Sequence, residues 1–141
     1  MIQHALINAR TGRIVASATT LALTRTERRR GLLGRSEFDP SAALVLAPCV
    51  MIHTAFMHFA IDVIFVDRAG RVVRVVRGLG PWRIAASFGA YATIELTAGA
   101  LDARDVAVGD RLYLEGVSDN SRSVAHAPLL PETPVLPGGP F

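Results

Sequence analysis

The sequence contains no lysine, only one cysteine and no long apolar run. A single cysteine cannot form a disulfide within the chain, which fits a reducing compartment. The apolar stretches are shorter than the roughly 20 residues that a membrane-spanning helix needs. The N-terminal segment MIQHALINARTGR also lacks the basic and continuous apolar parts of a signal peptide. We therefore expect a soluble, cytoplasmic protein that does not enter a membrane.

Because lysine is absent, arginine supplies all 15 basic side chains, and the chain has a net charge of +3. Arginine binds phosphate in a two-point geometry, but a GC-rich coding bias also explains an all-arginine composition. The arginines form no patch with interleaved aromatic residues, and such a patch is typical of nucleic-acid binding. The sequence therefore does not favour a nucleic-acid partner.

Half of the 141 residues are hydrophobic, which is enough for one packed domain. We predict a single mainly β domain over residues 1–117 and a proline-rich C-terminal tail over residues 118–141. Five prolines of the tail recur at every third position: Pro128, Pro131, Pro134, Pro137 and Pro140. Polyproline II has three residues per turn, so these prolines would share one edge and suit docking to a protein partner. The alternative is a flexible or surface-packed tail.

Short strands separated by turns dominate the chain. Residues 4–23 predict strands joined by a turn at Thr11-Gly12. The segments DVIFVD and RVVRVV, over residues 62–67 and 71–76, flank a turn and predict a hairpin. The first arm is apolar on both faces, so we expect it at the centre of a sheet. Further strands are predicted in residues 42–48 (AALVLAP), where Pro48 stops the strand, and in residues 91–96 (YATIEL).

One helix is expected early in the chain. Thr24 and Glu27 have the spacing of a capping box. The helix should end near Gly34, with Leu32 and Leu33 facing the core. The pattern as a whole predicts a mainly β fold, a small β-sandwich or barrel-like domain with one short amphipathic helix near the N-terminus.

The segment from Cys49 to Asp67 holds the cysteine and two of the four histidines. Cys49, His53 and Met57 are spaced four apart, so on a helix they could share one soft metal ion. On a strand each pair would be about 13 Å apart, too far to do so. The segment has β-branched and aromatic residues and no helix caps, which favours extended or looped backbone. If a metal binds, this ligand set suits copper(I) best.

A cysteine-dependent enzyme is a second interpretation of the same segment. Cys49, either His53 or His58, and Asp62 could supply a nucleophile, a base and an orienting group. However, Cys49 follows a proline beside an apolar strand, and no positive environment that would stabilise a thiolate is evident. A lone cysteine in such a setting behaves as a small buried hydrophobe. We therefore assign no catalytic residue, and the sequence identifies no cofactor.

A polar pocket at one end of the barrel is the interpretation that we prefer. We expect it to be lined by His53, Asp62, Trp82 and Glu95. Asp62 and Glu95 lie in apolar strands, where a buried carboxylate needs a partner. Structural ion pairs would meet that need, and a pocket for a small-molecule ligand is the functional alternative. Trp82 could form a wall of this pocket or cap the core.

Several linked motifs resemble the bacterial and archaeal family called domain of unknown function 192. The matching motifs are Glu27-Arg28, residues 31–35 (GLLGR), residues 61–67 (IDVIFVD), residues 70–72 (GRV), residues 94–96 (IEL), Gly99 and residues 108–110 (VGD). Their order and spacing hold from about residue 13 to residue 115. The resemblance implies a small, mainly β domain and no established activity. Many members carry a Phe-Trp-Met-Lys-Asn-Thr-like block before the aspartate that matches Asp62, whereas residues 52–57 here read IHTAFM.

These observations favour a non-enzymatic binding or accessory domain with a polar pocket. One alternative is a copper-like metal site or a Cys/His-dependent enzyme that uses Cys49 and His53. Another is a scaffold recruited through the Pro128–Pro140 tail.

Overall fold

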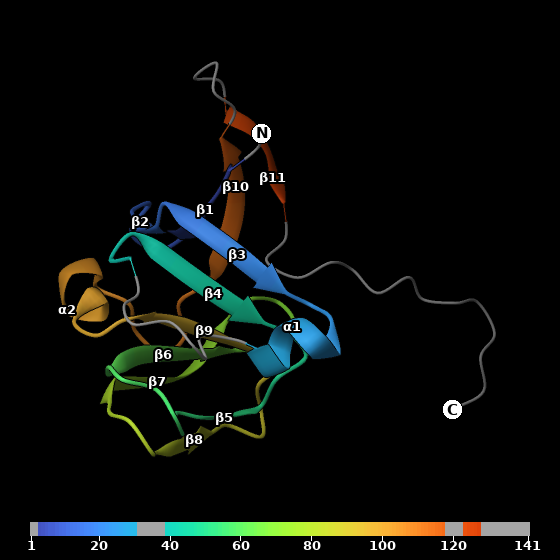
Figure 1. Ribbon diagram of the computed structural model, residues 1–141. Helices are drawn as coiled ribbons and strands as arrows, with labels where there is room; N and C mark the ends of the chain where they lie inside the picture. The colour runs from blue at the N-terminus through green and yellow to red at the C-terminus, as the bar shows by residue number, and fades with distance from the viewer. Residues whose placement is uncertain (1–2, 31–38, 118–122, 128–141) are drawn as a thin grey trace.

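A computed structural model describes residues 3–30, 39–117 and 123–127, and its strands form three sheets (Figure 1). The mainly β prediction is confirmed. The described sheets are layered against one another and do not close into a barrel. Neither described helix has the length and apolar character that a membrane crossing requires.

Five strands form the central sheet in the order β3-β4-β9-β6-β7. Their bounds are β3 (Ala18–Ala22), β4 (Ala42–Leu46), β6 (Ile61–Val66), β7 (Val72–Leu79) and β9 (Ala92–Thr97). Only β3 and β4 run parallel to one another, and the other neighbours in this sheet are antiparallel. The predicted hairpin is confirmed as β6 and β7, joined by a turn in which Gly70 has a φ of 81°. This positive φ is open to glycine at little cost.

Strand β6 explains how the central sheet supports a core on each face. All six of its residues are buried, and successive side chains point to opposite faces. Ile64 and Val66 belong to one apolar cluster, and Ile61, Val63 and Phe65 belong to another. The expected central position of this strand is therefore confirmed.

A four-stranded antiparallel sheet, in the order β11-β10-β1-β2, packs on the first cluster. Its bounds are β1 (Gln3–Asn8), β2 (Ile14–Ala16), β10 (Leu112–Val117) and β11 (Ser123–Ala127). Helix α2 (Ala100–Arg104) contributes Leu101 to the same cluster. Strand β11 lies within the predicted tail and pairs with β10. The proline series of that tail lies outside the described residues.

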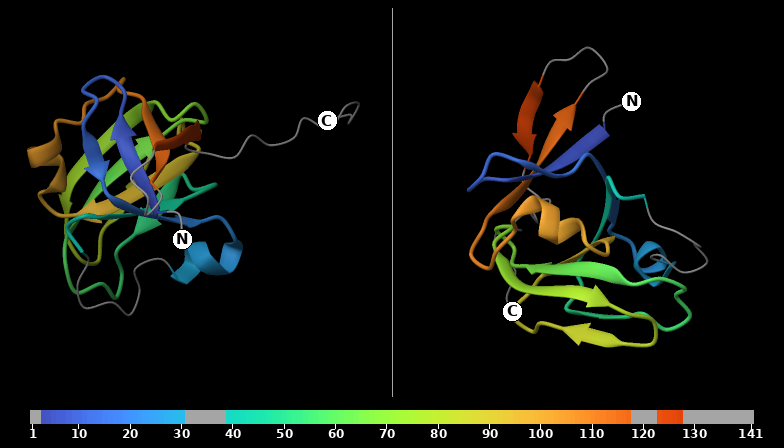
Figure 2. Two further views of the ribbon diagram at one scale, coloured as in Figure 1. Left: turned by 90° about the horizontal axis from the view of Figure 1, so that it is seen from above. Right: turned by 90° about the vertical axis from the view of Figure 1, so that its left-hand side faces the viewer.

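A two-stranded sheet of β5 (Met51–His53) and β8 (Ile84–Ala86) covers the second cluster. Ile52 and Ala85 point inward from its two strands. In Figures 1 and 2 this two-stranded sheet lies at the end of the molecule opposite β10 and β11. The backbone from Cys49 to Asp67 is a short strand, turns and a second strand, so the predicted extended or looped conformation is confirmed.

Helix α1 (Arg25–Arg30) begins with the predicted capping box. The amide of Thr24 donates to Glu27 Oε1 at 3.3 Å, and the amide of Glu27 donates to Thr24 Oγ1 at 3.1 Å. These two bonds satisfy amides that have no partner within the helix. The expected end of the helix near Gly34, with Leu32 and Leu33, lies outside the described residues.

Candidate functional site

Asp62 is buried in β6 and accepts three backbone hydrogen bonds. Its Oδ1 accepts from the amide of Gly78 at 2.9 Å, and its Oδ2 accepts from the amides of Gly99 and Leu101 at 3.0 and 3.1 Å. Two of these amides belong to the start of α2, which makes no side-chain cap bond of its own. The carboxylate therefore joins β6 to its neighbour β7 and ties α2 to the central sheet.

Glu95 lies on the neighbouring strand but faces the opposite side of the sheet. It is directly opposite Val63 on β6 and Leu44 on β4, and both of these residues belong to the second apolar cluster. Only 6% of Glu95 is exposed, and its Oε2 has no hydrogen-bond partner in the part of the chain that the structure describes. Burial raises the pKa of this carboxyl group to about 7, because the charged form loses its hydration.

His53 and Trp82 lie apart from both carboxylates, on the two-stranded sheet. His53 is exposed on β5 and pairs with Ile84 on β8, two residues after Trp82. Trp82 is 64% exposed. The structure thus places His53 on the two-stranded sheet and Trp82 in the turn that leads into it, whereas it places Asp62 and Glu95 on opposite faces of the central sheet.

The side chains considered as metal ligands are spread over different environments. Cys49 is half-buried, and its Sγ donates to the carbonyl of Met51 at 3.2 Å. Met57 is buried in the second cluster, whereas His53 and His58 are exposed. Within residues 3–30, 39–117 and 123–127, no three His, Cys, Asp or Glu side chains are grouped as metal ligands would be.

The outer surface of the two-stranded β5–β8 sheet concentrates exposed apolar side chains. We call this surface the apolar face and define it as Met51, Phe56, Trp82, Ile84 and Phe88, which are 57–86% exposed. Along β8 and its flanks, Trp82, Ile84 and Phe88 are all at even positions, as expected for residues on one side of a strand, and the half-buried Ala86 lies between the last two. Exposed apolar patches on soluble domains mark interaction sites.

Two aromatic residues of the apolar face are held on unusual backbone. Phe56 has a φ of 65° and Trp82 a φ of 60°, although neither is glycine. Bulky residues rarely adopt positive φ, and the cost is about 1–3 kcal/mol each. Their rings contact one another with centroids 4.7 Å apart and planes tilted by 59°. Both side chains remain about two-thirds exposed despite this contact.

Thr54 is the residue that fixes both aromatic turns. It is fully buried, and its Oγ1 donates to the carbonyl of Gly80 at 2.6 Å and accepts from the amide of Arg83 at 2.8 Å. Its carbonyl accepts from the amides of Trp82 and Met57 at 3.0 and 3.1 Å. Sequence analysis did not single out Thr54 or Phe56, because their contacts are with residues 80–83, which are distant in the sequence. The alternation of apolar residues from position 82 to position 88 was the available signal.

Two further features lie beside the apolar face: an exposed arginine and the outer edge of β5. Arg83 is exposed between Trp82 and Ile84, and no ion pair engages its guanidinium among the described residues. The pairing of Ile52 with Ala85 leaves the amides and carbonyls of Met51 and His53 pointing away from β8. The outer edge of β5 is paired with no other described strand.

Comparison with known proteins identifies the fold. The model of the DUF192 family, described as an uncharacterized ACR, matches residues 6–114. A candidate transcription regulator from Sinorhizobium meliloti 1021 has a similar structure, with a TM-score of 0.69 and 24% identity over 79% of this chain and 91% of that one. A protein of unknown function from Novosphingobium aromaticivorans DSM 12444 gives a TM-score of 0.68 and 20% identity over 79% and 84% of the two chains. At these identities the likeness shows the fold alone. No curated protein matches the chain.

Proposed function

This chain belongs to the DUF192 family, and from its geometry we propose that it is a non-enzymatic binding domain that docks a protein partner on the apolar face. The observation that carries the proposal is the exposed Phe56–Trp82 pair on strained backbone. Each ring is about two-thirds exposed, and each backbone has a positive φ. Strain of this kind persists where the surrounding structure enforces it, and it concentrates at functional sites.

The bonds of Thr54 supply that enforcement. A buried hydroxyl that joins Gly80 to Arg83 holds the Trp82 turn from within. The core gains little from the arrangement, because both aromatic rings point outward. Tryptophan and arginine are the residues that most often carry binding energy at protein interfaces. The face therefore has the composition of a binding surface and lacks that of an ordinary solvated one.

The chemistry of the face selects an extended, acidic and apolar segment as its partner. Met51 on β5 and Ile84 on the adjacent β8 point outward, so apolar side chains on the outer side of a strand added beside β5 would extend the apolar face. The unpaired edge of β5 offers backbone donors and acceptors to such a strand. The free guanidinium of Arg83 favours a carboxylate on the partner. We therefore propose a partner segment in which aliphatic residues alternate with acidic ones.

Trp82 is the only tryptophan of the chain, so its fluorescence reports on this face alone. The test is titration with a capped octapeptide of alternating valine and glutamate. We expect a saturable shift of Trp82 emission to shorter wavelength, with a dissociation constant of about 0.1–1 mM. A valine–lysine octapeptide should give no shift. Equal responses to the two peptides, or no response to the acidic one, would overturn the proposal.

A pair of matched variants separates the apolar face from general stickiness. Ile84 and Ile14 are both exposed isoleucines at the first position of a three-residue strand, 70% and 55% exposed. Ile14 lies in the four-stranded sheet, which is separate from the β5–β8 sheet. We expect Ile84→Asp to weaken peptide binding at least tenfold and Ile14→Asp to leave it unchanged. Equal losses in both variants would argue against docking at β5–β8.

A further inference from the structure

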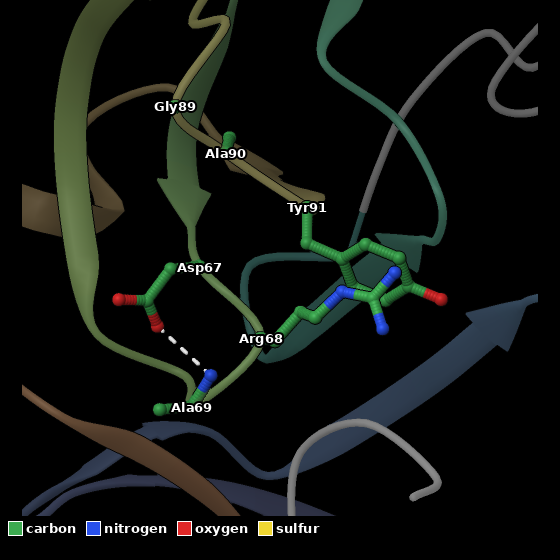
Figure 3. A pocket seen from close by; sticks show the side chains of 6 residues that line it. All are labelled: Asp67, Arg68, Ala69, Gly89, Ala90 and Tyr91. Carbon is green, nitrogen blue, oxygen red and sulfur yellow. Dashed lines mark hydrogen bonds between the residues drawn. The ribbon is translucent and has the colours of Figure 1, made fainter. Parts of the chain in front are cut away.

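A pocket lies between two turns near the start of β9. The turn at residues 67–69 joins β6 to β7 and faces the segment at residues 89–91, which leads into β9 (Figure 3). The cavity between them has a volume of about 580 Å³ and is lined by Asp67, Arg68, Ala69, Gly89, Ala90 and Tyr91. This volume lies within the range of about 300–1,000 Å³ that is typical of small-molecule sites.

The guanidinium of Arg68 lies over the ring of Tyr91 in this pocket. Its guanidinium carbon is 4.5 Å from the centroid of the ring, and Figure 3 shows the side chain reaching across from the turn. Arg68 is exposed, and its guanidinium carries five N–H donors in a planar fork that can bind a ligand beside the ring. No acidic side chain forms an ion pair with Arg68 in the described part of the chain. Arg68 is therefore a positioned cation that no ion pair engages among the described residues.

The adjacent carboxylate does not neutralise Arg68, because it is used by the turn. Asp67 Oδ1 accepts from the amides of Ala69 and Arg71, both at 2.9 Å. Figure 3 shows the Asp67 carboxylate on the side of the turn away from Tyr91. Asp67 lines the pocket, but it forms no ion pair with Arg68, so a paired carboxylate for the guanidinium would come from a ligand.

The Tyr91 wall is fixed by its backbone. The amide of Tyr91 donates to the carbonyl of Val66 at 2.8 Å, and its own carbonyl accepts from the amide of Cys49 at 2.8 Å. Gly89 and Ala90 add almost no side-chain bulk to the cavity, and an added Cβ at Gly89 would meet no atom within 4 Å. The pocket can therefore admit an apolar body beside the guanidinium.

From this geometry we propose that the Arg68–Tyr91 pocket binds a small monocarboxylate with an aromatic or apolar body. The guanidinium edge matches a carboxylate in two-point geometry. A phosphate carries more charge and needs several donors, whereas Arg68 is the only cationic side chain in the lining. The pocket shares no residue with the apolar face, although Phe88 precedes Gly89 in the chain, and the proposal does not depend on the docking function.

The test uses benzoate as the probe, with nuclear magnetic resonance of the ¹⁵N-labelled full chain. We expect saturable shifts of the Arg68 Nε–H and of the amides of Ala69, Gly89 and Ala90, with a dissociation constant of about 1–10 mM. Benzamide, which has the same shape without the charge, should produce no saturable shift. Inorganic phosphate should bind at least fivefold more weakly. Phosphate binding as tight as benzoate binding would overturn the assignment of a carboxylate.

Arg68→Gln should raise the dissociation constant of benzoate at least tenfold. Arg68→Lys keeps the charge without the fork, so we expect an intermediate loss. Arg13 is another exposed arginine, in the turn that joins β1 to β2, so Arg13→Gln is the matched control and should bind as wild type. Equal weakening in Arg13→Gln and Arg68→Gln, or unchanged binding in Arg68→Gln, would refute the site. Ile84→Asp should retain benzoate binding, which keeps the two proposals distinguishable.

Discussion

The two faces of the central sheet treat a buried carboxyl group in opposite ways. Asp62 and Glu95 lie on adjacent strands, and the pairing of Val63 with Glu95 places them on opposite sides. On the side of the four-stranded sheet, Asp62 accepts three backbone hydrogen bonds. On the side of the two-stranded β5–β8 sheet, Oε2 of Glu95 has no hydrogen-bond partner among the described residues. The buried carboxyl group of Asp62 therefore has hydrogen-bond partners, whereas the buried carboxyl group of Glu95 costs stability because one of its oxygens has none among the described residues.

The same contrast extends into the two outer layers. In the four-stranded layer, Asp110 accepts from Arg10 Nε at 2.6 Å, from Asn8 Nδ2 at 2.8 Å and from the amide of Ala107 at 2.8 Å. The hydrogen bond from Arg10 is the main reason that the pKa of Asp110 falls to about 2. The layer formed by β5, β8 and their turns instead exposes Phe56 and Trp82, whose backbone is strained. We conclude that the first layer serves stability and that the second retains features that favour binding.

The largest expected effect is on the satisfied face. Asp62→Ala would leave three amides without their acceptor, and each unsatisfied buried group costs about 1–3 kcal/mol. We expect the free energy of unfolding to fall by about 3–5 kcal/mol, measured by urea denaturation with circular dichroism. Asp102 is a suitable control, because it is 74% exposed and only pairs with Arg77 at the surface. Asp102→Ala should cost less than about 1 kcal/mol, and similar losses in the two variants would contradict our account of Asp62.

The second effect concerns pH and the unsatisfied face. The pKa of Glu95 is about 7 in the folded protein, compared with an ordinary value of 4.5. The folded state therefore holds a proton that the unfolded chain has already lost, so stability declines as pH rises from about 4.5 to about 7. At about 1.4 kcal/mol per pKa unit, the decline from this group is about 3 kcal/mol.

Glu95→Gln should remove that decline, since the amide does not titrate. The measurement is the unfolding free energy of wild type and variant between pH 4 and pH 8, and the difference curve isolates Glu95. Asp110 acts with the opposite sign: its low pKa stabilises the fold above about pH 3.8, and that contribution is lost as pH falls towards about 2. A difference curve without a slope between pH 4.5 and pH 7 would show that Glu95 is not held in its protonated form.

The smallest expected effect concerns the role of Thr54 in holding Trp82 beside the β5–β8 sheet. Thr54→Val keeps the shape of the side chain but removes its bonds to Gly80 and Arg83. We expect a loss of about 2 kcal/mol and faster decay of Trp82 fluorescence anisotropy. Thr20 is an exposed threonine of β3, so Thr20→Val is the matched control and should change neither quantity. Unchanged anisotropy in Thr54→Val would mean that Thr54 does not hold Trp82 in place.

Local patterns in the sequence predicted the parts of the fold that depend on neighbouring residues. The hairpin of β6 and β7 and the Thr24–Glu27 capping box involve contacts over a few positions, and both are confirmed. The partners of Asp62 lie 16–39 positions away, so the need for partners was predictable but their identity was not. Trp82 could equally have been a core residue, because alternating apolar positions do not reveal which side of a strand faces solvent.

The pairing of β1 with β10 has a consequence for how the protein emerges from the ribosome. Gln3 is matched with Val117, so β1 cannot pair with β10 until synthesis has passed Val117. The β6–β7 hairpin, by contrast, can close as soon as its second arm appears. Contacts between distant segments form slowly, and domains fold while synthesis proceeds from the N-terminus. We therefore expect the sheet that contains the first strand to be among the last parts of this protein to assemble.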